Sequence, residues 1–167
     1  MAVKQVLIYP DERLRQVSEP VEDFEAQEFK DLVQDLKDTM EAYRAQGLAA
    51  IQIGVPKRVL VIRTSEGDVK VFSNPVTREA LGFVKSKEGC LSFPSVMEII
   101  ERHEDVTVRA YDEHGKEFEC SLDEIDAVAI QHELDHLDGV LFIDHVSRLT
   151  KRFMLKRLNK FRRIAGL

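Results

Sequence analysis

The feature that most constrains the fold is a predicted helix, residues 121–139, that is apolar almost all the way round. Ser121 and Glu124 match a capping box, in which these two side chain types satisfy amide groups at a helix start. Most of the next residues are apolar, namely Ile125, Ala127, Val128, Ala129 and Ile130. Gly139 is a typical residue for the end of such a helix. Because a helix without a clear polar face is usually surrounded by other elements, we expect this one at the centre of the fold.

Strands are predicted in the middle of the chain and helices at both ends. Apolar residues at helical spacing predict an amphipathic helix over 25–43, and Ser147 is placed to cap a C-terminal helix that runs to about 164. Partial alternation predicts strands over 58–63, 69–73, 96–101, 106–111 and 117–120, with a turn over 112–115. The small, apolar stretch 46–54 has no clear periodicity. This order predicts an α+β fold, with antiparallel or mixed strands packed around the central helix and a C-terminal helix.

Length and composition indicate one cytoplasmic domain. A chain of 167 residues that is 44% hydrophobic can form a single core, which argues against intrinsic disorder. Two cysteines are too few for a disulfide-rich secreted scaffold. No apolar run approaches the roughly 18 residues of a membrane span, and the N-terminal residues do not resemble a secretory signal. We therefore expect a protein of the reducing cytosol with no membrane association.

The charge is divided unevenly along the chain. The formal net charge is −6, but residues 145–167 hold eight of the 24 basic residues and no acidic residue. A basic tail on an acidic body has two interpretations. It is either a solvated helix face that keeps the protein soluble, or a docking surface for an anionic partner such as a nucleic acid.

The predicted central helix contains the motif His-Glu-x-x-His. Because His132 and His136 are four residues apart, their rings share one helix face and can bind the same metal ion. Glu133 lies beside the first ring and can accept a proton from a water that the metal activates. The alternative is a helix with ordinary core or surface histidines. An apolar surrounding disfavours that alternative, because buried imidazoles need polar partners.

A third metal ligand is not fixed by the spacing. Metalloproteases with this motif use a downstream Glu, or a His in the pattern His-x-x-Gly-x-x-His. Gly139 fits that pattern, but Phe142 stands where the histidine is required, and His145 lies off the spacing. Cys90 is the remaining candidate. A lone cysteine is more often a small buried apolar residue, and its contact with the helix cannot be deduced from the sequence spacing.

Three segments in order resemble the motifs of the peptide deformylase family. They are Gly-Leu-Ala-Ala-Ile-Gln at 47–52, Glu-Gly-Cys-Leu-Ser at 88–92 and Gln-His-Glu-Leu-Asp-His at 131–136. The N-terminal segment Tyr-Pro-Asp-Glu-Arg-Leu-Arg at 9–15 is also similar to that family. The resemblance covers nearly the whole chain, and it is the order of all three segments that makes it specific.

The resemblance implies a hydrolase with one divalent metal. Cys90, His132 and His136 would hold the metal, with a fourth position left for water. The family typically works with Fe(II), and the ligand set also suits Zn or Ni. Glu133 would act as a general base and then as the acid that protonates the leaving amine.

The resemblance also implies a substrate and its contacts. The substrate would be the N-formyl-methionyl end of a nascent polypeptide, and formate would be released. The side chain of Gln52 and the backbone N–H of Leu91 would donate hydrogen bonds to the developing oxyanion. Gly47 and Gly89 would allow the peptide to lie along the backbone like an added strand.

Bacterial deformylases that resemble this chain use a basic C-terminal tail to bind the ribosome. We therefore expect a metal-dependent catalytic domain over 1–147 and a basic helix over 148–165 that packs on it or extends from it. The helix would be the ribosome-binding element of a monomeric protein.

The chain departs from the family at Ala45, Ile51 and Met97, where many members have Gly, Pro or Thr, and Arg. These positions touch substrate binding rather than the metal ligands. Two alternative functions remain open. One is a small metallopeptidase whose third ligand is a carboxylate or a histidine. The other is an inactive, ribosome-binding relative, for which Ala45 and Met97 would be signs of drift.

Overall fold

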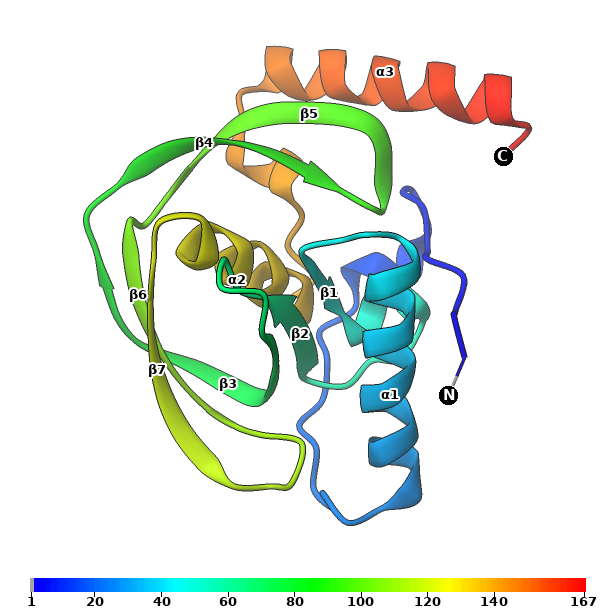
Figure 1. Cartoon of the computed structure of the whole chain (residues 1–167). Coiled ribbons are helices and arrows are strands. Elements are labelled where there is room, and N and C mark those ends of the chain that lie inside the picture. Colours follow the sequence, from blue (N-terminus) through cyan, green and yellow to red (C-terminus); the bar gives the residue numbers. More distant parts are fainter. Residues whose placement is uncertain (1) are drawn as a thin grey trace.

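Helix α2 (Glu124–Leu137) lies at the centre of the fold, between the strands that curve around it (Figure 1). The computed structural model describes residues 2–167. Most of α2 is buried, from Ala127 and Ile130 to Leu137, and it packs against β1, β2, β6 and β7. The prediction of an α+β fold around a central helix with this motif is therefore confirmed.

The strands form two antiparallel sheets. The larger has the order β1-β2-β3-β6-β7, and the smaller consists of β4 and β5. The strands are β1 (Gly47–Ala49), β2 (Val59–Arg63), β3 (Val69–Leu81), β4 (Val84–Cys90), β5 (Phe93–Arg102), β6 (Asp105–Tyr111) and β7 (Glu117–Asp123). Short 3-10 helices are η1 (Glu12–Arg15), η2 (Ala50–Ile53) and η3 (Phe142–His145). Because β1 lies at one edge of the larger sheet, only one side of it is paired with another strand of the described chain.

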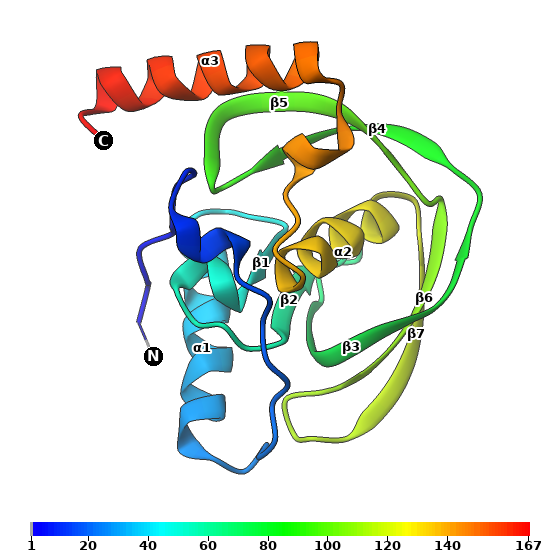
Figure 2. The same ribbon diagram turned by 180° about the vertical axis from the view of Figure 1, so that it is seen from behind.

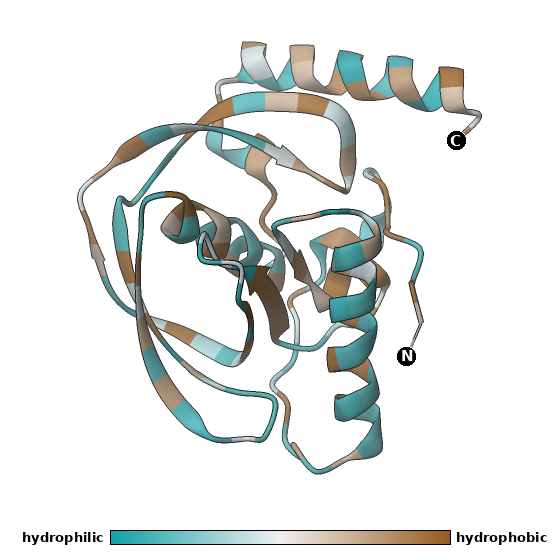
Figure 3. Cartoon of the chain, in the orientation of Figure 1, coloured by the Kyte–Doolittle hydropathy of each residue, from teal (hydrophilic) through white to brown (hydrophobic). Residues whose placement is uncertain are grey.

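The core consists of three adjoining clusters. The first lies between α2 and the larger sheet, with Leu60 and Phe72 fully buried. In the second, α1 (Gln27–Ala42) packs Leu36 and Met40 against β1 and β2. The third joins β5 and η3 to the C-terminal helix. Figure 3 shows the result: β2 is strongly hydrophobic, whereas α1 is hydrophilic on its outer face.

Helix α3 (Arg148–Ala165) lies along β5 in both views of the molecule (Figures 1 and 2). Ser147 caps it as predicted, because its hydroxyl accepts a hydrogen bond from the Thr150 amide at 3.2 Å. Met154 and Leu158 are buried against the third core cluster, and the outer face carries the basic residues. Within residues 2–167 no helix is both long and apolar enough to cross a membrane.

The predicted capping box at Ser121 is wrong. Strand β7 continues to Asp123, so that Ser121 is paired with Thr107 of β6 and their hydroxyl oxygens lie 3.0 Å apart. Helix α2 begins only at Glu124, and the Asp123 side chain makes no capping hydrogen bond. Pairing with β6 satisfies the backbone here, which a local capping pattern cannot reveal.

Two strands were missed by the sequence patterns. Strand β1 lies in the stretch 46–54, whose small residues show no alternation, and η2 follows it directly. Strand β4 alternates charged and small residues instead of apolar ones, and it is held by its pairing with β5. Strand β3 also extends well beyond the predicted 69–73, through irregularities in its register with β6. In each case, pairing with a neighbouring strand determines where the strand lies, and the local sequence pattern does not.

Candidate active site

A cavity of about 680 Å³ lies beside α2 and contains the residues of all three sequence motifs. Strand β1 supplies Gly47, and η2 supplies Gln52. Strand β4 and the turn after it supply the segment 88–91. Helix α2 supplies His132 and Glu133. Segments far apart in the sequence therefore meet in one place.

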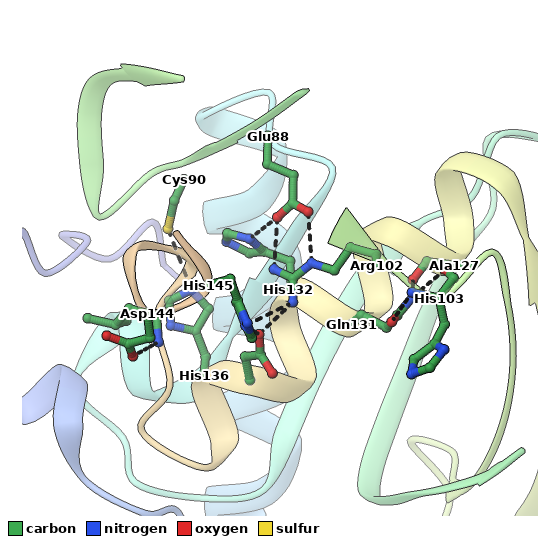
Figure 4. Close-up of polar contacts among 12 residues, drawn as sticks. Glu88, Cys90, Arg102, His103, Ala127, Gln131, His132, His136, Asp144 and His145 are labelled. Carbon is green, nitrogen blue, oxygen red and sulfur yellow. Dashed lines mark hydrogen bonds and ion pairs between the residues drawn. The ribbon is translucent and has the colours of Figure 1, made fainter. Parts of the chain in front are cut away.

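Cys90, His132 and His136 form a group that could hold a metal ion. One ligand atom from each residue lies within 4.8 Å of the others, and Cys90 Sγ is 3.5 Å from His136 Nε2 (Figure 4). The two histidines are at least nine-tenths buried. A thiolate and two imidazoles at this spacing fit a transition metal with one coordination position left open. His136 Nδ1 has no hydrogen-bond partner within residues 2–167.

Glu88 fixes the orientation of the His132 ring. Its Oε1 lies 2.9 Å from His132 Nδ1, which leaves Nε2 for the metal-binding group. Arg102 donates to both oxygens of Glu88, from Nε at 2.8 Å and from Nη2 at 2.9 Å (Figure 4). Histidine ligands of metals are commonly held in this way by a carboxylate. Burial opposes the charge of Glu88, but the hydrogen bonds from Arg102 and His132 outweigh it and lower the pKa of Glu88 to about 2.

The two histidines have opposite pKa shifts in the metal-free protein. Burial acts to lower the pKa of His132, but the interaction with Cys90, the hydrogen bond with Glu88 and the charge of Glu133 outweigh burial and raise it. Burial, together with the positive charge of His132, lowers the pKa of His136 well below its ordinary value. Since both rings must be neutral to bind a metal, binding is expected to displace a proton from His132.

Glu133 is 5% exposed and lies in the same cavity. Its Oε2 has no hydrogen-bond partner in the part of the chain that the structure describes. Burial raises the pKa of Glu133 to about 7, although the charge of His132 acts in the other direction. A carboxylate with a pKa near neutrality and a free oxygen can both accept and return a proton.

Gln52 is held by both ends of its amide group. Its Oε1 accepts a hydrogen bond from the Ala49 amide at 3.0 Å. Its Nε2 lies 3.2 Å from Ser92 Oγ and 3.6 Å from Cys90 Sγ, so an N–H points toward the metal-binding group. Leu91 lies in the turn between β4 and β5 and also lines the cavity. The two predicted oxyanion donors are therefore both next to Cys90.

The two glycines differ in what surrounds them. A Cβ added to Gly47 would lie 2.8 Å from Glu133 Oε1, so the backbone of β1 approaches this carboxylate as closely as it does because residue 47 has no side chain. A Cβ on Gly89 would instead collide with Met97 Sδ, the mobile end of a flexible side chain. Gly47 is therefore required by Glu133 itself, which the sequence analysis did not anticipate.

Comparison with known proteins identifies the family. The family model described as polypeptide deformylase matches residues 3–152. The chain belongs to the polypeptide deformylase family. The resemblance in the sequence is confirmed, and so are the enzyme class and its dependence on a metal that Cys90, His132 and His136 are arranged to bind.

Relatives with a peptide deformylase name match over nearly their full length. The chain is 44% identical to that of Pelagibacter ubique, over 97% of this chain and 96% of the relative. A crystal structure of the Legionella pneumophila peptide deformylase superposes with a TM-score of 0.95 at 40% identity, and covers 99% of this chain and 98% of that one. A structure from Ehrlichia chaffeensis, in complex with actinonin, has a TM-score of 0.93 at 35% identity, with coverages of 98% and 99%.

The sequence analysis missed the charged network behind the deformylase motifs. No role was predicted for Glu88 or Arg102, and His145 was considered as a metal ligand, for which it lies off the motif spacing. In the structure Arg102 Nη1 also donates to Asp135 Oδ2 at 2.6 Å, and His145 Nε2 lies 2.7 Å from the same oxygen. Three charged residues could have indicated this network in the sequence. Glu88 and Arg102 fall on the paired strands β4 and β5, and Asp135 lies inside the His-Glu-x-x-His motif.

Proposed function

We propose that this deformylase hydrolyses the formyl group from the N-formyl-methionyl end of newly made polypeptides and releases formate, with Glu133 as its general base. The observation that carries the proposal is the position of Glu133. Glu133 lines the same cavity as Cys90 and His132, which form the metal-binding group with His136, and its buried Oε2 has no hydrogen-bond partner in residues 2–167.

The proton transfers are assigned to Glu133. A divalent metal held by the Cys/His/His group would polarise the formyl oxygen and lower the pKa of a water molecule. Glu133 accepts the proton of this water as it attacks the formyl carbon. The same carboxyl group then returns the proton to the leaving amine, so that the carbon–nitrogen bond breaks to give formate and a free amino terminus. In the metal-free protein the pKa of Glu133 is about 7, so the carboxyl group can exist in either protonation state near neutral pH.

Gln52 and Leu91 stabilise the negative charge that develops on the formyl oxygen. The Nε2 of Gln52 is oriented by Ser92 and by the bond from the Ala49 amide to Oε1. The backbone N–H of Leu91 is the second donor in this proposal. A donor of this kind typically contributes about 3 to 4 kcal/mol to transition-state stabilisation.

The peptide lies between β1 and β4. Strand β1 is at a sheet edge, and β4 pairs only with β5 among the described strands, so both offer backbone groups to an added strand. Gly47 and Gly89 mark the two facing backbones at the cavity. The cavity wall from α2, with Val128 and Ala129, is apolar and suits a methionine side chain.

A formate-release assay with the metal-loaded, anaerobic protein tests this function. We expect turnover of a formyl-Met tripeptide by the wild type, and none by Glu133→Ala with the same metal content. Cleavage of internal bonds in unformylated peptides would instead indicate a metallopeptidase. Absence of any turnover with metal bound would indicate an inactive relative, and would refute the proposal.

Fe(II) is the native metal in this proposal. One soft thiolate and two imidazoles suit Fe(II), Zn or Ni, and the family resemblance favours Fe(II). Metal analysis of protein purified without oxygen and without added metal tests the assignment. Zinc or nickel as the bound metal in such a preparation would overturn it.

We also propose that α3 binds ribosomal RNA and that residues 1–147 form the catalytic part of a cytoplasmic monomer. Truncation is a poor test, because Met154 and Leu158 belong to the core. Charge removal at exposed positions is cleaner: Arg152, Lys156, Lys160 and Arg163 are changed to Ala. We expect salt-sensitive ribosome binding to be lost, and to persist in a control with the exposed Lys30, Arg78, Lys85 and Lys116 changed to Ala. Unchanged binding by the α3 variant would refute the proposal.

A further inference from the structure

A chain of charged side chains extends from the metal-binding group to the protein surface on another face of α2. It begins at His132, continues through Glu88 and Arg102, and reaches Asp135. Arg102 is 5% exposed; its two hydrogen bonds to Glu88 are buried, and the one to Asp135 is partly buried. A buried guanidinium in this position needs both carboxylates, because each one fixes a different side of its planar fork.

His145 closes the chain at its outer end. Its Nε2 lies 2.7 Å from Asp135 Oδ2 and 3.3 Å from Arg102 Nη1, and Figure 4 shows the ring turned toward the guanidinium. Since the carboxylate of Asp135 can only accept, the 2.7 Å contact is a hydrogen bond that Nε2–H of the imidazole donates to Asp135. The ring is itself held in place, because Phe142 and Ile143 anchor η3 in the core.

We propose that Asp135 and His145 are positioning residues for the metal ligand His132. His145 fixes the carboxylate of Asp135, and Asp135 fixes the Nη1 side of Arg102. The other side of Arg102 is then aligned with both oxygens of Glu88. Glu88 in turn sets the orientation and the protonated nitrogen of His132, which are what a metal ion requires of this ring. This inference rests on the proposed metal site.

A second histidine near this network, His103, allows the role of His145 to be separated from a merely surface contact. His103 is the matched control, because it is a half-buried histidine that directly follows Arg102 in the chain. Its Nδ1 lies 3.1 Å from the Gly82 carbonyl oxygen and its ring packs on Phe83, with no contact to Asp135. Loss of His103 therefore removes an imidazole from the same region and leaves the chain to His132 intact.

The test is the rate at which the Co(II)-loaded protein loses its metal to an excess of chelator, followed by visible absorption. For His145→Ala we expect loss that is about 3- to 10-fold faster and an altered Co(II) spectrum. For Asp135→Asn we expect about 10- to 100-fold faster loss, the range known for residues that support metal ligands. His145→Gln, which keeps a donor, should restore most of the wild-type rate. His103→Ala should match the wild type.

Thermal unfolding of the metal-free variants shows whether each one is folded. Wild-type dissociation rates and spectra in both His145→Ala and Asp135→Asn would overturn the inference, as would an equal effect of His103→Ala. A wild type without a thiolate-to-cobalt absorption band would be a different result, because it would refute the proposed metal site and not only its support.

Discussion

The two faces of α2 differ in whether their buried polar groups have hydrogen-bond partners. On the face toward the main cavity, Glu133 Oε2 is buried without a hydrogen-bond partner in residues 2–167. On the face toward Arg102, the buried charges are paired: Arg102 contacts Glu88 and Asp135, and Asp135 also contacts His145.

An unpaired buried polar group typically costs 1 to 3 kcal/mol, so its presence indicates a group reserved for a ligand. A network of paired charges instead fixes the positions of its side chains. The cavity face is therefore organised for chemistry, and the other face supports the metal ligand His132. Substitutions on the two faces should therefore have different consequences.

The largest effect is expected on the cavity face. Glu133→Gln keeps the size of the side chain but cannot accept a proton, so the rate of formate release should fall by about 10²- to 10⁴-fold. The metal content should not change, and the free energy of unfolding should not decrease. Formate release by variants with matched metal content measures the effect. Glu119→Gln, on the exposed side of β7, is the control. More than a tenth of wild-type activity would contradict the assignment.

On the supporting face, the expected loss is of stability. Arg102→Met removes the guanidinium that pairs with Glu88 and Asp135. Removing one member of a buried ion pair typically costs about 3 to 5 kcal/mol. Urea unfolding of the metal-free protein measures it. Arg109→Met is the matched control, because the Arg109–Glu117 pair is exposed and worth about 0 to 1 kcal/mol. Equal losses in the two variants would mean that the network does not support the fold.

The same network predicts a dependence of stability on pH. The pKa of Glu88 is lowered in the folded state from 4.5 to about 2, so its contribution is fully present above pH 4.5 and is lost as the pH falls toward 2. The loss is of the order of 3 kcal/mol in the metal-free protein. Urea unfolding at pH 6, 4 and 3 should show this decline in the wild type. The decline should be smaller in Glu88→Gln, and equal slopes would contradict the pairing.

The smallest effect separates the two glycines. Gly47→Ala places a Cβ against Glu133 Oε1 and should displace this carboxylate, with a fall in kcat of about 10- to 100-fold. Gly89→Ala meets only the flexible end of Met97, so its effect should be clearly weaker. Steady-state kinetics on one formyl-Met peptide compares them. Equal effects would show that the peptide, and not Glu133, requires Gly47.

The local part of this site could be predicted from the sequence, and the non-local part could not. His132, Glu133 and His136 lie within two helical turns, so helix geometry alone brings them together. Cys90 comes from a strand 42 residues earlier than His132, and only the family resemblance placed it in the group. The contacts of His145 with Asp135 and Arg102 join η3 to α2 and β5. No spacing in the sequence predicts contacts between such separate segments.

The same distinction explains the fold. Helices α1 and α3 were predicted within two residues of their observed bounds, because their apolar residues recur at helical spacing. Strands β1 and β4 were missed because their partners define them. The capping pattern at Ser121 was overruled by the register between β6 and β7. Local patterns therefore predict helices in this chain better than they predict strand limits.

X-ray absorption spectroscopy of the Zn(II)-loaded protein tests the central claim most directly, because it reports which atoms bind the metal. We predict one sulfur ligand at about 2.3 Å and two imidazole nitrogens at about 2.0 to 2.1 Å. The sulfur contribution should disappear in Cys90→Ser. A wild-type spectrum with nitrogen and oxygen ligands alone would contradict the Cys/His/His site and the function derived from it.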